Sequence, residues 1–116
     1  MEQGKQILCS ASKYTEKFYL NPLFANIPQK IQDELKVACV LFTEEIGGVI
    51  LLYYDDEGNL LISTDFNEND FLYDEIGSVL KIKQLQEEKK ELLESLELYY
   101  KAFFLNQDIS ALLTQE

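Results

Sequence analysis

The chain has 116 residues, of which 47% are apolar, and this size fits one domain with a single hydrophobic core. Its 21 acidic residues outnumber 10 basic ones, all of them lysine, and the formal net charge is −11. Proteins that neutralise phosphates need a basic face, and arginine is the residue that reads phosphate and guanine through paired hydrogen bonds. The composition therefore argues against nucleic acid as a direct partner, and the negative field argues against an anionic membrane surface.

The chain contains no Pro-rich or Gly/Ser-rich linker and no internal repeat, so residues 1–116 are expected to form one domain. Looser order is expected only at the ends, in residues 1–9 and 107–116. The first residues lack the apolar run of a signal peptide, and the longest apolar blocks, 37–42 and 49–54, are far shorter than a membrane span. A cytoplasmic location is the expectation.

Residues 10–20 are ambiguous: the spacing of Tyr14 and Phe18 favours a helix, whereas KFYL also fits a short strand. Asn21-Pro22 then interrupts the chain, because proline disfavours helical geometry in the residue before it. From Pro28, apolar residues recur at steps of three and four until Gly47, a typical helix stop. A helix is predicted over residues 28–46, with its second half buried.

Two apolar runs joined by DDEGN predict an antiparallel β-hairpin over about residues 48–66. Asp55 at the start of the turn and Gly58 in a left-handed position would set the register. One face would then carry the pairs Tyr54–Leu60, Leu52–Ile62 and Ile50–Thr64, and the other Val49–Asp65, Leu51–Ser63 and Tyr53–Leu61. Because the second face is half apolar, something is expected to cover part of it.

An apolar stripe runs from Leu72 to Phe103 and predicts a long helix over residues 70–105. An unbroken helix of this length would extend on the order of 50 Å, more than the width of so small a domain. Either the helix bends, near residues 77–78 or within 86–91, or its stripe packs against a second subunit. The C-terminal half of this stripe contains Leu92, Leu96, Tyr99 and Phe103.

The chain has no histidine, which excludes Ser-His and Cys-His nucleophile pairs and any metal site built on imidazole. No glycine-rich phosphate-binding motif is present. The two cysteines, Cys9 and Cys39, fit neither a C-x-x-C motif nor a disulfide framework, and Cys39 falls on the apolar stripe of the first helix. The chain is therefore expected not to be an enzyme and to need no cofactor.

Two acidic groups are candidate metal sites. Asp65, Asn67 and Asn69 match the first alternating oxygen ligands of a calcium loop, but Asp70 and Ile76 replace the glycine and the glutamate that such a loop needs. Glu87, Glu91 and Glu94 share one face of the predicted helix, and their E-E-x-x-E spacing resembles the magnesium-binding signature of the all-α MazG-like nucleotide pyrophosphohydrolases. The second acidic motif and the arginines of that family are missing. The structural alternatives are a helix cap and a solvated helix face.

Most of the chain, from LKVACVLFTEEIGGVILLYYDDEGNLL through LYDEIGSVLKIKQLQEEKKELLESLELYYKAFFL, resembles small acidic bacterial proteins grouped as a family of unknown function. This resemblance implies one α+β domain and brings no activity or site residue with it. The sequence itself predicts a protein-interaction domain that forms a homodimer. The hairpin face with Val49, Leu51 and Tyr53, or the helix stripe, would form the interface. A metal-binding domain or hydrolase, and an acidic inhibitor or chaperone of a basic partner, are the alternatives.

Overall fold

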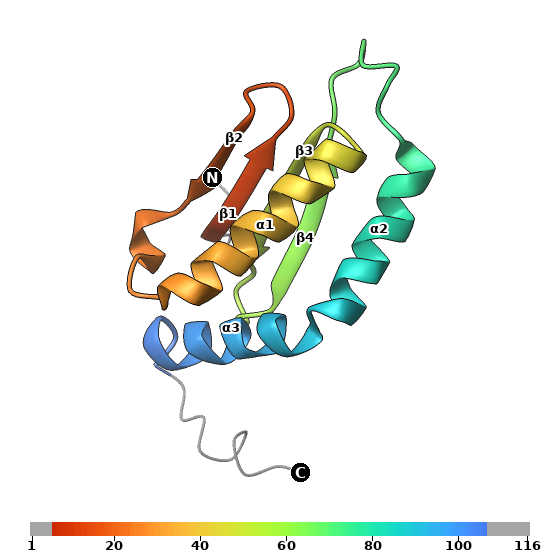
Figure 1. Cartoon of the computed structure of the whole chain (residues 1–116). Coiled ribbons are helices and arrows are strands. Elements are labelled where there is room, and N and C mark those ends of the chain that lie inside the picture. Colours follow the sequence, from red (N-terminus) through yellow and green to blue (C-terminus); the bar gives the residue numbers. More distant parts are fainter. Residues whose placement is uncertain (1–5, 107–116) are drawn as a thin grey trace.

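A computed structural model of the chain describes residues 6–106 as a four-stranded antiparallel sheet with three α-helices, which confirms the predicted α+β class. The strands are β1 (Gln6–Ser12), β2 (Lys17–Leu20), β3 (Val49–Tyr54) and β4 (Leu60–Asp65), and they lie in the order β2-β1-β3-β4. The helices are α1 (Gln29–Glu45), α2 (Glu75–Glu88) and α3 (Lys90–Phe103), and a short 3-10 helix (Pro22–Phe24) precedes α1 (Figure 1). Residues 1–5 and 107–116, which include most of the two ends expected to be loosely ordered, lie outside the described residues.

The helix favoured for residues 10–20 is wrong, because these residues belong to the hairpin formed by β1 and β2. Phe18 and Leu20 are more buried than Lys17 and Tyr19, which is the alternation of a strand. The backbone between the strands turns sharply, with Glu16 at a φ of 55° and its N–H donating to the Ser12 carbonyl oxygen at 2.8 Å. Residues 6–9, expected to be loosely ordered, form the first half of β1.

The predicted register of the second hairpin is confirmed at all six pairs, from Val49–Asp65 to Tyr54–Leu60. Gly58 has the expected left-handed backbone, with a φ of 87°, and its N–H donates to the Asp55 carbonyl oxygen at 3.2 Å. One carboxylate oxygen of Asp55 accepts the N–H groups of Glu57 and Asn59, each at 2.9 Å. The Asp55 carboxylate therefore stabilises the turn, as expected when DDEGN is interpreted as a hairpin connection.

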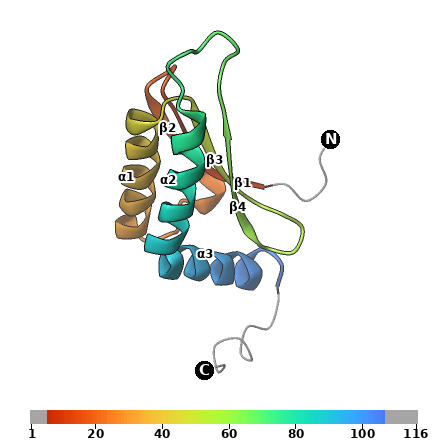
Figure 2. The ribbon, with the colours of Figure 1, turned by 90° about the vertical axis from the view of Figure 1, so that its right-hand side faces the viewer.

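Within residues 6–106, the helices lie on one face of the sheet. Helix α1 crosses this face diagonally, α2 stands in the same layer beyond β4, and α3 runs across the end of the sheet where β3 ends (Figures 1 and 2). The core lies between the sheet and this helical layer, and a bulge in β1 turns both Leu8 and Cys9 inward. Its largest fully buried side chains are Leu8, Phe24, Leu35, Phe42, Ile50, Leu52, Tyr54 and Leu96.

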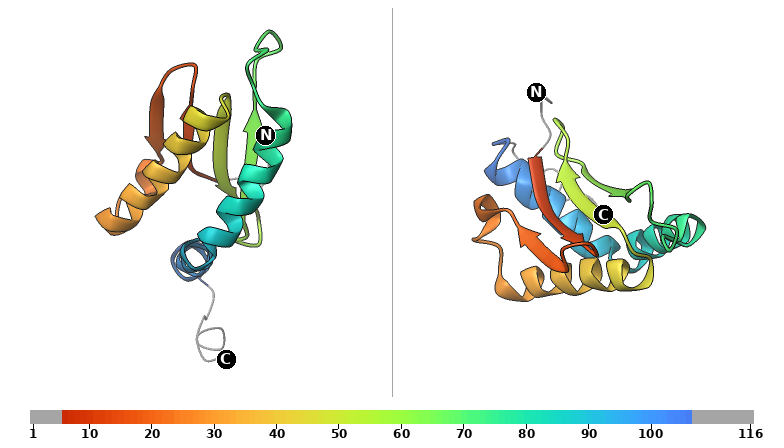
Figure 3. Two further views of the ribbon diagram at one scale, coloured as in Figure 1. Left: turned by 45° about the vertical axis from the view of Figure 1, so that its right-hand side comes forward. Right: turned by 90° about the horizontal axis from the view of Figure 1, so that it is seen from above.

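The predicted long helix is interrupted at Lys89, within the stretch 86–91 where a bend was expected, and it continues without a break past Gly77 and Ser78. Lys89 has a non-helical backbone (φ −108°, ψ 24°), and α3 leaves it in a new direction (Figure 3). Helix α2 begins at Glu75 rather than at residue 70. The Asp74 carboxylate caps this first turn by accepting the Gly77 N–H at 2.8 Å. With this bend, the chain covers Leu85 and Leu96 of its own apolar stripe.

Candidate functional site

The residues of the two predicted metal groups make other contacts or lie on different elements. The Asp65 carboxylate accepts its neighbour's N–H, from Phe66, at 2.8 Å, and the Asn67 N–H donates to the Tyr14 hydroxyl oxygen at 3.0 Å. The interruption at Lys89 leaves Glu87 on α2 but places Glu91 and Glu94 on α3, so the expected single acidic helix face does not exist. Among residues 6–106, no three His, Cys, Asp or Glu side chains are grouped so that they could hold a metal ion.

The C-terminal half of the predicted helix stripe is largely used inside the protein. Leu96 is 2% exposed, so it has no surface to offer a second chain. Leu92 and Tyr99 are half-buried and pack against the core, while Phe103 keeps 71% of its surface exposed. Of the four interface residues predicted on this helix, only Phe103 is mainly at the surface.

Along β3, Val49, Leu51 and Tyr53 alternate with buried residues, so they lie on the sheet face opposite the core. No described helix covers that face (Figure 2). The strand register identifies the residues of β1, β2 and β4 on the same side, because directly paired residues on neighbouring strands point to the same face of the sheet. We call this the open sheet face: it consists of Ile7, Ser10, Ser12, Lys17, Tyr19, Val49, Leu51, Tyr53, Leu61, Ser63 and Asp65. The half-apolar second face of the hairpin was expected to be partly covered, and no described helix covers it.

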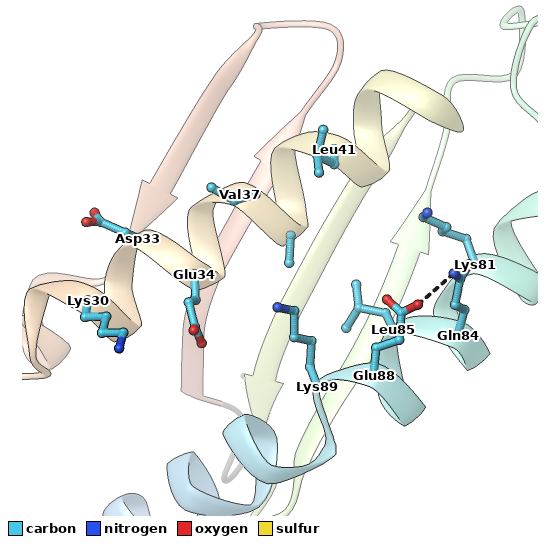
Figure 4. Close-up of a pocket in the computed structure, with 11 residues that line it drawn as sticks. Lys30, Asp33, Glu34, Val37, Leu41, Lys81, Gln84, Leu85, Glu88 and Lys89 are labelled. Carbon is cyan, nitrogen blue, oxygen red and sulfur yellow. Dashed lines mark hydrogen bonds between the residues drawn. The ribbon is translucent and has the colours of Figure 1, made fainter.

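A groove of about 450 Å³ lies between α1 and α2 (Figure 4). Its apolar surface comes from Val37, Ala38 and Leu41 on one side and Leu85 on the other, and charged side chains surround it. Lys81 spans the two helices near one end, with its Nζ 2.7 Å from Glu45 Oε1. Both signs of charge are interspersed along the rim, at Lys30, Asp33, Glu34, Lys81, Glu88 and Lys89.

Five of the six most exposed large apolar side chains in the described residues fall within ten residues of each other, at the start of α2 and just before it. We call these five residues the 71–80 surface. On α2, Ile76, Val79 and Leu80 recur at steps of three and four, which places them on one side of the helix. The exposed fractions are 90% for Phe71, 93% for Leu72, 78% for Ile76, 66% for Val79 and 64% for Leu80. Sequence periodicity placed Leu72, Ile76 and Val79 on one apolar stripe of the long helix, and in the structure Leu72 precedes α2 and all three are exposed.

The segment that carries Phe71 and Leu72 is held by side chains on either side of them. The Asp70 carboxylate accepts the Tyr14 hydroxyl at 2.6 Å, which ties the segment to the turn between β1 and β2. The Tyr73 ring stacks on Phe66 with centroids 4.3 Å apart, and it lies against the backbone of Gly48. Between these two anchors, the side chains of Phe71 and Leu72 lie at the surface.

The two thiols lie in the core. Cys9 and Cys39 are both free and at most 1% exposed. A hydrogen bond with Cys39, together with burial, raises the pKa of the Cys9 thiol far above its ordinary value. A thiol in this state is a structural apolar group rather than a nucleophile, which is the role expected for Cys39 from its place on the helix.

Taken together, fold and surface define a small acidic α+β domain whose conspicuous features are exposed apolar faces. The chain belongs to a family of unknown function, DUF6145, whose model matches residues 5–108. No curated protein and no solved structure matches the chain. In the described part of the chain, no helix is both long and apolar enough to cross a membrane.

Proposed function

We propose that the protein is a non-enzymatic cytoplasmic domain that works by binding other proteins, and that it forms a homodimer through the open sheet face. The observation that carries this proposal is the uncovered face itself. Val49 and Leu51 are half-buried, and Ile7 and Leu61 are 38% and 39% exposed, on the side of the sheet that no helix within residues 6–106 covers. Two sheets pack face to face at about 10 Å when their inner side chains are apolar or small.

The charges at the edges of this face are complementary to those of a second copy. Lys17, Ser12, Val49 and Asp65 form one row across the sheet, with the lysine at one edge and the aspartate at the other. A two-fold axis parallel to the strands exchanges the two edges, so that Lys17 of each copy meets Asp65 of the other. The interface would then combine an apolar centre with two ion pairs at its rim.

The proposal is tested by light scattering coupled to gel filtration at high micromolar concentration. We expect a mass of about 27 kDa, twice the 13.5 kDa of one chain. Leu51→Lys places a charge in the middle of the open sheet face and should produce a monomer. Leu41→Lys, a matched change on the helical side where Leu41 is 52% exposed, should leave the dimer intact. A monomeric wild-type protein would rule out the dimer.

A charge exchange tests the orientation of the two copies. Lys17→Glu brings two acids together at each rim contact, and Asp65→Lys brings two lysines together, so each single change should weaken the dimer. The double variant restores opposite charges and should recover most of the lost affinity. If the two single changes act independently, the axis is not parallel to the strands.

A further inference from the structure

The 71–80 surface lies apart from the residues of the open sheet face. Its five large apolar side chains, at the exposed fractions given above, present on the order of 600–700 Å² of apolar surface. The largest apolar patch on a typical monomeric protein is about 300–600 Å², and one partner of a standard interface contributes about 800 Å². The summed area is at or above the largest apolar patch of a typical monomer and approaches the share of one partner in a standard interface.

The charged residues within and just before this surface, from residue 65 to residue 80, are all acidic. Residues 37–80 contain ten of the chain's 21 acids and none of its ten lysines, so nearly the whole net charge of −11 arises in this segment. Glu68, Asp70, Asp74 and Glu75 lie next to the exposed apolar residues. The two ion pairs within residues 6–106, Lys13–Glu44 and Lys81–Glu45, involve none of these four carboxylates.

We infer that the 71–80 surface binds a basic, amphipathic segment of a different protein, with that segment's apolar side on Phe71, Leu72 and the exposed side of α2. Lysine or arginine side chains flanking the apolar side would then face Glu68 and Glu75. A second copy of this chain is a poor occupant, because a symmetric contact would bring eight like charges together around the interface. The surface is thus assigned by charge complementarity to a basic partner.

The test uses a synthetic peptide of leucine and lysine, about 18 residues or five helical turns long, with all leucines on one side. Fluorescence anisotropy of the labelled peptide measures its affinity for the full chain. A scrambled peptide of identical composition carries the same charge without the apolar side, and we expect it to bind at least about tenfold more weakly. Equal affinity for both peptides would mean that charge alone causes the binding, which would overturn the inference.

Variants locate the binding surface. The double change Phe71→Ser and Leu72→Ser alters no charge and no buried residue, and we expect it to weaken binding by about tenfold or more. The matched pair Val37→Ser and Leu41→Ser changes the exposed residues of the α1–α2 groove and should have little effect. If the groove variants lose binding and the Phe71 and Leu72 variants do not, the inference is wrong.

Two further readouts separate this surface from the proposed dimer. Glu68→Gln with Glu75→Gln should weaken peptide binding and reduce its dependence on salt, whereas Asp56→Asn with Glu57→Gln, at the hairpin turn, should have a smaller effect. Leu51→Lys should abolish the dimer and leave peptide affinity unchanged. If Phe71→Ser with Leu72→Ser instead turns a dimer into a monomer, the surface belongs to a second copy and the inference fails.

Discussion

The hydroxyl group of Tyr54 donates a hydrogen bond to the backbone carbonyl oxygen of Leu96 at 2.9 Å, with both residues buried in the core. This bond joins the end of β3 to the middle of α3. The Tyr54 ring also stacks on Tyr100 of the same helix, with centroids 4.0 Å apart. Burial is the main cause that raises the pKa of Tyr54, and the neighbouring Cys9 and Glu97 add to it, so the hydroxyl stays a proton donor throughout the ordinary pH range.

Tyr54→Phe keeps the stacked ring and removes only the hydroxyl. Because the Leu96 carbonyl oxygen would lose this partner inside the core, we expect the free energy of unfolding to fall by about 1–3 kcal/mol, measured by urea denaturation. Tyr19→Phe is the control, since Tyr19 is 49% exposed and water can replace its interactions. Equal effects of the two changes would show that the buried bond contributes nothing specific.

The lowered pKa of Asp55 should make the free energy of unfolding depend on pH. Burial opposes ionisation, but hydrogen bonds from Asn59, Glu57 and Gly58 outweigh it and lower the pKa of Asp55 below its ordinary value. A lowered folded-state pKa gives stability that is present above the unfolded-state pKa of about 4 and is lost as the pH falls through the folded-state value.

Asp55→Asn should therefore cost up to about 1 kcal/mol at pH 7, where water screens this half-exposed site, and almost nothing in strong acid. Urea denaturation of both proteins between pH 7 and pH 2 measures the difference. Asp56→Asn, which changes the adjacent and more exposed carboxylate, controls for the loss of one negative charge. A difference between wild type and Asp55→Asn that does not shrink in acid would contradict the argument.

Two adjacent glycines before β3 should respond very differently to alanine. At Gly48 the φ is 67°, and an added Cβ would lie 2.5 Å from the Asp65 carbonyl oxygen and 2.6 Å from the Tyr73 ring. At Gly47 the φ is 96°, but the nearest atom would be 3.8 Å away. We expect Gly47→Ala to cost about 1 kcal/mol from backbone strain alone, and Gly48→Ala to cost about 2–4 kcal/mol because the backbone or the ring must move. Thermal and urea unfolding of both variants decide whether the clash adds to the strain.

The thiols provide a measure of core opening. Cys9 and Cys39 should resist iodoacetamide in the native protein at pH 8, because both are buried and the raised pKa of Cys9 keeps its thiol protonated. Both should react readily in concentrated guanidinium chloride. Mass spectrometry after timed labelling counts the modified residues. If the native thiols are labelled rapidly, and destabilising variants such as Tyr54→Phe do not change the labelling rate, then the reagent reaches the thiols without unfolding of the protein.

The second hairpin was the part of the fold most readable from sequence. Asp55 and Gly58 specify their turn through local chemistry, and a turn of fixed length leaves one register for the strands it joins. Helix α1 was readable for a similar reason, since its periodic apolar residues end at a glycine. Both features depend on residues that are neighbours along the chain.

The errors arise where distant contacts decide the structure. Residues 10–20 form a strand pair because β1 pairs with β3, across a long separation that local spacing does not report. The interruption at Lys89 has no proline or glycine to signal it, and beyond it Leu96 and Tyr100 reach the core beside Tyr54. Periodicity gave Leu96 and Ile76 the same role, yet the bend buries the first and leaves the second 78% exposed.

The order of the strands also bears on how the chain folds. Each outer strand pairs with its neighbour in sequence, so the sheet consists of two local hairpins joined by the β1–β3 contact, where Ala11 lies opposite Ile50. A lone two-stranded hairpin is only marginally stable in water. The late, distant β1–β3 pairing should therefore limit the folding rate. Ile50→Val, which weakens this contact, should then slow refolding in stopped-flow experiments. Neither hairpin would be stable enough to fold before the other.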